Sequence, residues 1–325
     1  MSSAGRASSA ARTSVIVPTV TPAKAVRVLE SLGGCEGDFE TILVDNGTGA
    51  AELDRAAARL GATEVVRAPG NLGYSRAMNL GAGFAQGDTL VLLNDDVQLA
   101  PDYVELMSAA IDPAAGIVMG AGVMRQADAP ELIETAGIEL DRTLLAFDHL
   151  NGEPLSVLDA PAPDPIGPSG VAAAFDREAF LDVGGFDERI FAYLEDVDLV
   201  LRLRLAGARC RLVRALGVHE HSATLGSGSA RKDYLMGFGR GYLLRKWSVL
   251  NVRRAPAVLA RELAICAGQA VVDRNIAGVR GRVNGMRAAA PRGYPVRALQ
   301  DEGPSLTASL LRRWRRRMRL RRAAG

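Results

Sequence analysis

Short apolar runs that end in polar or acidic residues recur along the chain. The clearest is residues 89–93, which follow a turn signal at residues 86–88 and lead directly into Asn94, Asp95 and Asp96. The shortness and β-prone composition of the run predict a buried strand. Ligands of open α/β sheets bind outside the carboxyl ends of the strands, so the acids after this run are candidate binding groups.

Two earlier runs have the same form. One ends at Pro18 and Thr19 and the other at Asp45, and turn residues follow each. As strands of one sheet, both would end near the same edge as residues 94–96. The pattern therefore predicts an α/β sheet with polar groups gathered along one edge.

A helical pattern opens at Glu195 and stops at Gly207. Acids in a first helical turn are stabilised by the helix dipole, and Asp198 with Arg202 is spaced for an i,i+4 ion pair. This structural explanation accounts well for Asp198 and only partly for Asp196. A functional explanation makes one of the carboxylates a general base that accepts a proton from an attacking hydroxyl.

The three histidines lie in different patterns. A strand-like segment at residues 211–218 leads to His219 and His221, which would face the same way on an extended chain, so a metal could use either. A lone histidine is more often structural than a ligand. His149 lies in residues 120–168, a stretch with many prolines near its end, for which we predict a high loop content and a solvated histidine.

The acids at residues 94–96 admit two explanations. Mg²⁺ and Mn²⁺ take oxygen ligands and bridge one or two protein carboxylates to substrate phosphates. Such a cation would neutralise a departing diphosphate. Alternatively, these residues only cap the next helix, since Asp and Asn are favoured at turns and N-caps.

Residues 71–79 also admit two explanations. Gly73 permits a close backbone approach, and the amides of Asn71 and Asn79 suit a pyrimidine or ribose. Arg76 would then face a diphosphate. The simpler explanation is a helix start with a polar cap and a solvated Arg76.

Taken together, these blocks resemble glycosyltransferase family 2, and most of all its bacterial rhamnosyltransferase-type members. The resemblance covers about residues 13–250, and the combined order is far more specific than any single block. The matching blocks are residues 15–19 with 43–47, 71–79, 94–96, 184–187 with 195–198, and 219–224.

The resemblance implies a GT-A fold: one α/β nucleotide-sugar-binding domain with a mixed, mostly parallel sheet, a divalent cation and inversion at the anomeric carbon. By position, Asp96 would bind Mg²⁺ or Mn²⁺, with His219 as a second ligand. Asp196 would be the catalytic base and Glu195 would contact the acceptor. Asn94 replaces a more usual Asp. The donor-binding residues that it implies are Pro18, Thr19, Asp45, Asn71, Gly73, Arg76, Asn79, Asn94 and Asp95.

Composition is consistent with a cytoplasmic enzyme. The chain has 325 residues, of which 48% are hydrophobic, and its three cysteines are isolated, which argues against a disulfide framework and a zinc site. We predict a disordered leader at residues 1–13, the glycosyltransferase domain at 14–250, and a helical, basic extension at 251–325. Residues 120–168 are expected to shape the acceptor pocket.

The extension bears on membrane contact. We predict no membrane span, because the best candidate, residues 255–272, contains Arg261 and Glu262; it fits a helix packed on the domain or a dimer element better. Residues 301–325 hold eight arginines and two acids, a net +6, in a basic amphipathic pattern. Such a helix suits an anionic membrane surface, somewhat ahead of a solvated terminus or nonspecific nucleic-acid binding.

The most specific hypothesis from the resemblance is transfer of rhamnose from dTDP-rhamnose to a lipid-linked GlcNAc-diphosphoryl-polyprenol. The enzyme would work at the inner face of the cell membrane; its expected partners include a second copy in a homo-oligomer and no specific nucleic acid. Two other functions stay open. A nucleotidyltransferase should carry a Gly-rich basic loop, which residues 17–21 lack; a noncatalytic sugar-binding or membrane-tethered scaffold protein would use the fold without chemistry.

Overall fold

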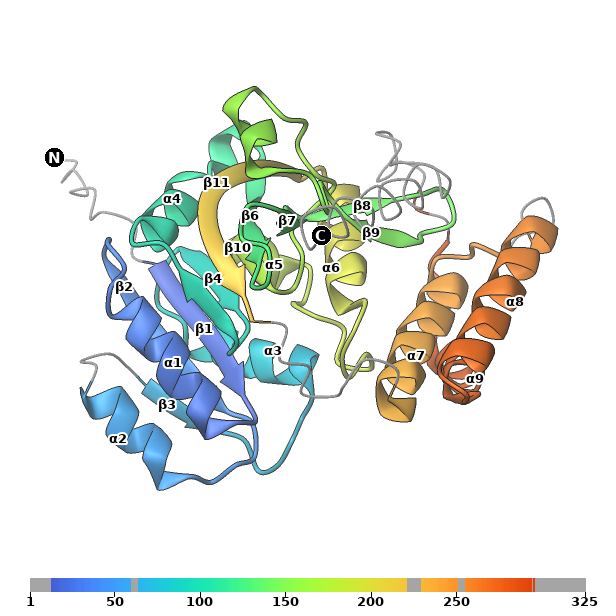
Figure 1. The fold of residues 1–325 in the computed structure, drawn as a ribbon, viewed down its shortest axis with the longest axis horizontal. Coiled ribbons are helices and arrows are strands. Elements are labelled where there is room, and N and C mark those ends of the chain that lie inside the picture. The colour runs from blue at the N-terminus through green and yellow to red at the C-terminus, as the bar shows by residue number, and fades with distance from the viewer. Residues whose placement is uncertain (1–12, 60–63, 221–228, 251–254, 294, 296–325) are drawn as a thin grey trace, which may run out of the picture.

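The computed structural model describes residues 13–59, 64–220, 229–250, 255–293 and 295. A curled sheet of nine strands lies at its centre, flanked by helices, and three further helices extend to one side (Figure 1). Neighbouring strands follow the order β3-β2-β1-β4-β10-β6-β11-β5, with β7 added beside β6. Residues 1–12 of the predicted leader and the arginine-rich tail lie outside the described residues, whereas Thr13, the last residue of that leader, begins the first strand.

The first half of the sheet is parallel and carries the predicted apolar runs. Its elements are β1 (Thr13–Thr19), α1 (Pro22–Leu32), β2 (Phe39–Asp45), α2 (Ala51–Arg59), β3 (Glu64–Arg67), α3 (Tyr74–Phe84) and β4 (Thr89–Leu93). In register, Thr19 lies beside Asp45, and β4 pairs with the other side of β1. All five residues of β4 are buried, as the continuous apolar run predicted.

The second half makes the sheet mixed. Its elements are β5 (Val97–Leu99), α4 (Tyr103–Ala109), a 3₁₀ turn (Pro113–Ala115), β6 (Ile117–Gln126), β10 (Ala172–Asp176), α5 (Arg177–Asp182), α6 (Glu195–Leu205) and β11 (Arg209–His219). The small-residue strand β10 is antiparallel to β4 and β6, whereas β11 is parallel to β6 and antiparallel to β5. The prediction of a mixed sheet is therefore confirmed; among the described strands, four pairs in it are parallel and four are antiparallel.

The stretch 120–168 contains more structure than its prolines suggested. It begins inside β6, a central strand, and continues through β7 (Ile133–Thr135), β8 (Ile138–Leu140), β9 (Ala146–Asp148) and a 3₁₀ turn (Leu155–Asp159). The prediction of a solvated His149 is wrong. The ring is 3% exposed and its two nitrogens bond to Glu139 at 2.5 Å and to the Pro163 carbonyl at 2.9 Å. Hydrogen bonds to groups ten and fourteen residues away in the sequence take the place of the contacts with water that the prediction assumed.

Three helices follow the sheet: α7 (Ala230–Lys246), α8 (Ala255–Val272) and α9 (Ala277–Ala288). α7 and α9 pack closely because glycines line their contact. A Cβ on Gly241 would collide with the Arg282 carbonyl, and one on Gly285 with the Phe238 carbonyl. Small residues at such positions let two helix backbones approach further than ordinary side chains allow.

Candidate active site

The carboxyl end of β4 and the end of β11 meet at one edge of the sheet. β5 follows the acids at residues 94–96 and pairs with β11, so that Val97 lies beside His219. This pairing brings the imidazole Nε2 of His219 within 3.1 Å of the Asp96 carboxylate. The two residues that the sequence proposed as metal ligands, which are 123 positions apart, are therefore neighbours.

Two residues of this cluster escaped the sequence analysis. Lys24 of α1 places its ammonium 3.2 Å from the second carboxylate oxygen of Asp96, and Glu134 of β7 bonds to Nδ1 of His219 at 2.8 Å. The only sequence signal for Lys24 was its place in the first turn of the helix that follows the first strand. Glu134 lay in the stretch predicted to be mostly loop, so nothing singled it out.

The charges of the cluster shift the pKa values of its members. Burial lowers the pKa of His219, but hydrogen bonds to Asp96 and Glu134 outweigh burial and raise it to about 9. Burial raises the pKa of Asp96, and the contacts with His219 and Lys24 outweigh it, so that the net shift is downward. Asp96 is therefore an ionised carboxylate at neutral pH.

Asp95 and the end of β1 complete this edge. The Thr19 hydroxyl donates to the Asp95 carboxylate at 2.7 Å, which joins the first and third predicted blocks. Pro18 lies beside Val44 in the strand register. The backbone amide of Asn94 donates a hydrogen bond to the Val171 carbonyl at 3.4 Å. Burial is the main cause of the raised pKa of Asp95.

The donor set fits a divalent cation that shares its coordination with a substrate. Asp96 offers an oxygen, and His219 would offer its Nε2 once a cation displaces the proton there; Glu134 holds the far nitrogen of the ring, an arrangement common behind metal-bound histidines. Within the described residues no three His, Cys, Asp or Glu side chains are grouped as a metal site. Two protein ligands plus phosphate oxygens are a normal set for Mg²⁺.

The second acid pair stands at the start of α6. Tyr193 and Leu194, immediately before it, have φ values of 70° and 69°. Left-handed backbone is unfavourable for residues with large side chains and persists where the surroundings enforce it. Here Gly239 of α7 packs against the Tyr193 carbonyl so closely that a Cβ would collide with it. The turn therefore presents Glu195 and Asp196 in an enforced position.

Asp196 accepts hydrogen bonds from backbone groups only among its described contacts. The Gly170 amide donates to one carboxylate oxygen at 3.0 Å and the Val197 amide to the other at 2.8 Å. The Tyr74 hydroxyl binds the carbonyl of the same Gly170. The Tyr74 hydroxyl and the Asp196 carboxylate thus both bind the Gly170 backbone and hold the turn at residues 169–171 next to the acid pair.

Burial is the main cause of raised pKa values in this pair. The pKa of Glu195 rises to about 8, with the Asp196 charge as the second cause. The pKa of Asp196 is also raised by burial, but its backbone hydrogen bonds oppose the shift. Those bonds favour the charged form of Asp196, and the charge of Asp196 adds to burial in raising the pKa of Glu195.

The pKa of Tyr193 is affected by carboxylates of both acidic motifs. After burial, the negative charges of Glu195 and Asp96 are the causes that raise its pKa. Only groups near both carboxylates experience both charges. Tyr193, which directly precedes Leu194 and the acid pair, is therefore within electrostatic range of carboxylates of both clusters.

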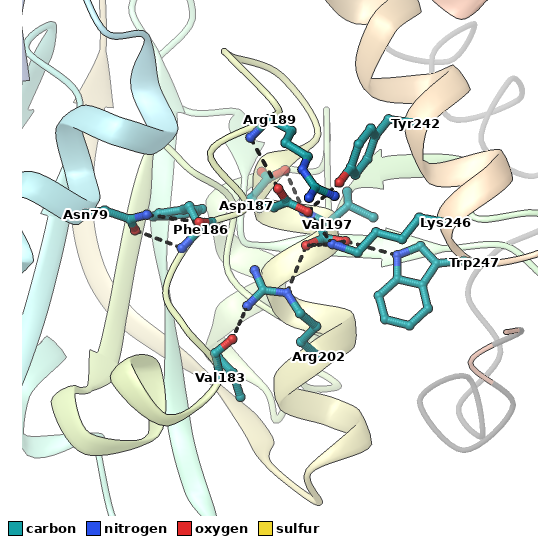
Figure 2. Close-up of polar contacts among 12 residues, drawn as sticks. Asn79, Val183, Phe186, Asp187, Arg189, Val197, Arg202, Tyr242, Lys246 and Trp247 are labelled. Carbon is teal, nitrogen blue, oxygen red and sulfur yellow. Dashed lines mark hydrogen bonds and ion pairs between the residues drawn. The ribbon is translucent and has the colours of Figure 1, made fainter. Parts of the chain in front are cut away.

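Asp198, in the same turn of α6, has entirely different surroundings. It is 0% exposed and binds Arg202 at 2.9 Å, Lys246 at 2.8 Å and the Trp247 indole nitrogen at 3.1 Å. Figure 2 shows Arg202, Lys246 and Trp247 near one another, with dashed lines for their polar contacts. The predicted i,i+4 pair of Asp198 with Arg202 is confirmed.

Lys246 also binds Asp187, at 2.6 Å, as does the Tyr242 hydroxyl (Figure 2). Burial raises the pKa of Asp187, but these two hydrogen bonds outweigh it and lower the pKa. The Gly-Gly-Phe-Asp block is thus tied to α6 and α7 by one lysine. Its role in the structure is to position the acid-bearing turn.

The proposed donor-binding residues of the second block serve the backbone in the structure. The Asn79 amide bonds both the amide and the carbonyl of Phe186, at 2.8 and 2.9 Å (Figure 2). Asn71 accepts from the Gly73 amide at 2.9 Å. Gly73 has φ 82°, and a Cβ there would collide with Phe191. Close backbone approach is confirmed, with Phe191 as the partner.

Asp45 and Arg76 also have protein partners. Asp45 is 1% exposed and binds Thr48 and Arg67, the latter at 2.5 Å. Arg76 is exposed and pairs with Glu188 at 3.3 Å. The contacts of both with nucleotide or diphosphate stay predictions.

Comparison with known proteins decides the family. The family described as Glycosyl transferase family 2 matches residues 14–160, and Glycosyl transferase family group 2 matches residues 89–232. The N-acetylglucosaminyl-diphospho-decaprenol L-rhamnosyltransferase of Mycobacterium tuberculosis (strain ATCC 25618 / H37Rv) is 31% identical over 237 residues, which cover 64% of this chain and 76% of that protein. The chain belongs to glycosyltransferase family 2.

Solved structures of glycosyltransferases share the fold. GalNAc-T7 with UDP, GalNAc and Mn²⁺ superposes with a TM-score of 0.57 at 16% identity, over 73% of this chain and 48% of that one. The mannosyltransferase PcManGT from Pyrobaculum calidifontis, in complex with GDP-Man and Mn²⁺, gives 0.53 at 16% identity, over 94% and 79%. The family 2 glycosyltransferase therefore has the predicted GT-A fold with appended C-terminal helices.

Proposed function

We propose that this glycosyltransferase moves rhamnose from dTDP-rhamnose to a hydroxyl of a lipid-linked GlcNAc-diphosphoryl-polyprenol, with inversion. The observation that supports the chemistry is the buried Asp196 carboxylate, which accepts hydrogen bonds from two backbone amides and stands beside Glu195, whose pKa is raised to about 8. The donor and acceptor follow the rhamnosyltransferase relative. Such an acceptor would place the enzyme on the cytoplasmic side of the cell membrane, in surface-glycan synthesis.

In the proposed mechanism, Asp196 accepts the proton of the acceptor hydroxyl as its oxygen attacks the anomeric carbon. The bond from that carbon to the diphosphate oxygen breaks, and the configuration inverts once. Glu195 contacts the acceptor. Asp95 lies near the donor sugar or ribose, beside Thr19.

At the leaving-group side, Asp96 and His219 would hold Mg²⁺ or Mn²⁺. When bound, the cation supplies charge stabilisation for the nucleoside diphosphate. Glu134 holds the orientation of the His219 ring through Nδ1. Lys24, already at Asp96, would supply a further positive charge to the diphosphate.

The test is a panel of nucleotide sugars with polyprenyl-diphosphate-GlcNAc and Mg²⁺ or Mn²⁺, following nucleoside diphosphate release and glycolipid product. Product from dTDP-rhamnose that is lost in Asp196→Asn supports donor, acceptor and base. The matched control is Asp182→Asn, the same change at an exposed acid that ends α5. Product from another donor would overturn rhamnose alone, and full activity of Asp196→Asn would overturn the base.

A further inference from the structure

Helix α8 turns an entirely apolar face to the outside. Leu263 is 69% exposed and Val271 and Val272 are each 78% exposed. No exposed residue within the helix has a polar side chain: the exposed set is Pro256, Ala257, Leu259, Ala260, Leu263, Ala264, Ala267, Gly268, Val271 and Val272. Exposed apolar faces of this extent mark surfaces that bind a membrane or another protein.

The polar residues of α8 all serve to attach it. Glu262, buried, binds Arg240 of α7 at 2.8 Å and Arg282 of α9 at 2.9 Å. Arg261 binds Asp141 of the loop between β8 and β9 at 2.6 Å. Breaking a buried ion group of this kind by removing one partner is strongly destabilising, so the attachment sets which face of α8 points outward.

This attachment bears on membrane insertion. Among the described residues, α8 is the one helix long and apolar enough to cross a membrane, by length and composition alone. A spanning α8 would have to break the ties of Glu262 to α7 and α9. A helix tied along one side and apolar along the other suits the plane of a membrane interface.

The positive charge of the C-terminal segment favours an anionic lipid surface over a second copy of the chain as the partner of α8. Residues 251–325 contain 17 arginines and four acids, a net +13, which leaves −11 for residues 1–250 of a chain whose total is +2. A second copy docked face to face would bring two such positive segments together. An anionic lipid surface attracts the segment and accepts the apolar face.

We propose that the exposed face of α8 docks in the plane of an anionic lipid bilayer. The proposal deepens the proposed function and rests on it for the lipid-linked acceptor. α8 is tied to α7, and Gly239 of α7 packs on the Tyr193 carbonyl beside the base. Docking through α8 would therefore hold the acid pair at a set orientation to the bilayer.

The test measures binding of the full chain to vesicles of phosphatidylcholine with or without 30% phosphatidylglycerol, free of any acceptor. Wild type is expected on the anionic vesicles, with binding weakened by salt. The double variant Leu263→Gln and Val271→Gln should bind the anionic vesicles with an affinity that is about tenfold lower, or lower still. Leu181→Gln, at a leucine of α5 that is 43% exposed, should bind as wild type does.

Two results would overturn the proposal. Equal vesicle binding by the double variant would show that other residues carry it, and a dimer that dissociates in the double variant, without vesicle binding, would assign the face to a second copy. Circular dichroism and thermal unfolding check that the double variant folds. Because no donor or acceptor is present, a failed rhamnose assay leaves this result intact, and failed docking leaves the transfer assay intact.

Discussion

Asp196 and Asp198 lie two residues apart in the first turn of α6, yet their surroundings are opposite. Asp198 is fully buried among Arg202, Lys246 and Trp247. Asp196 is held by two backbone amides, one oxygen of Glu195 is buried without a hydrogen-bond partner among the described residues, and burial raises the pKa of both acids. Both oxygens of Asp198 are occupied by hydrogen bonds from Arg202, Lys246 and Trp247, so they are not available to accept a proton from a substrate. The comparison teaches that, of two acids in one motif, the one without cationic partners is suited to be the base.

The largest effect is expected at Asp198. Asp198→Ala leaves Lys246 and Arg202 buried without their shared anion, which should lower the free energy of unfolding by about 3–5 kcal/mol. Urea unfolding measures the loss. Asp182→Asn on the exposed end of α5 is the control and should stay near wild type. A small loss at Asp198 would show that the cluster contributes little to stability.

The expected result at Asp196 is the reverse. Asp196→Asn should reduce kcat by about 10²–10⁴-fold, because it removes the proton acceptor. Its unfolding midpoint should not fall below that of wild type, since burial opposes the charge that the variant removes. Single-turnover kinetics and thermal unfolding on one preparation test both. A variant that is unstable as well as inactive would break the comparison.

Glu195 gives the pH signature. Its folded-state pKa, about 8, lies above its ordinary value of 4.5, so its contribution to stability is fully present below pH 4.5 and is lost as pH rises through 8. Glu195→Gln should therefore gain stability over wild type as pH rises from 5 to 8, by at most about 1.4 kcal/mol per pH unit. Unfolding at both pH values gives the difference. A constant difference would refute the raised pKa.

A smaller effect is expected at Lys24. Lys24→Met removes the ammonium at Asp96, and the KM for the nucleotide sugar should rise about tenfold, equivalent to about 1.4 kcal/mol. Lys24→Arg should restore part of the affinity. If both variants keep the wild-type KM, Lys24 serves Asp96 alone and does not contact the donor.

The smallest effect on stability is expected at Arg76. Its pair with Glu188 joins two side chains that are more than half exposed, so Arg76→Gln should change stability by less than about 1 kcal/mol. Donor affinity decides its role: a raised KM would support contact with the diphosphate, and an unchanged KM would leave a surface ion pair.

The sequence alone was enough for the fold class and for the order of the site. The run at residues 89–93 and the strands ending at Thr19 and Asp45 are local apolar patterns, and they lie in the sheet as predicted. The pair Asp96 and His219 also met as expected, because the ends of strands converge at one edge.

Only the tertiary structure decided which charged groups have partners. Lys246 reaches Asp198 from 48 residues away, and Glu134 reaches His219 from 85. His149, predicted to be solvated, is buried by contacts with Glu139 and Pro163. Burial and ion pairing depend on distances between remote segments, and these distances set the pKa values on which the chemistry depends. Local periodicity determines an element, whereas its electrostatic surroundings come from the whole fold.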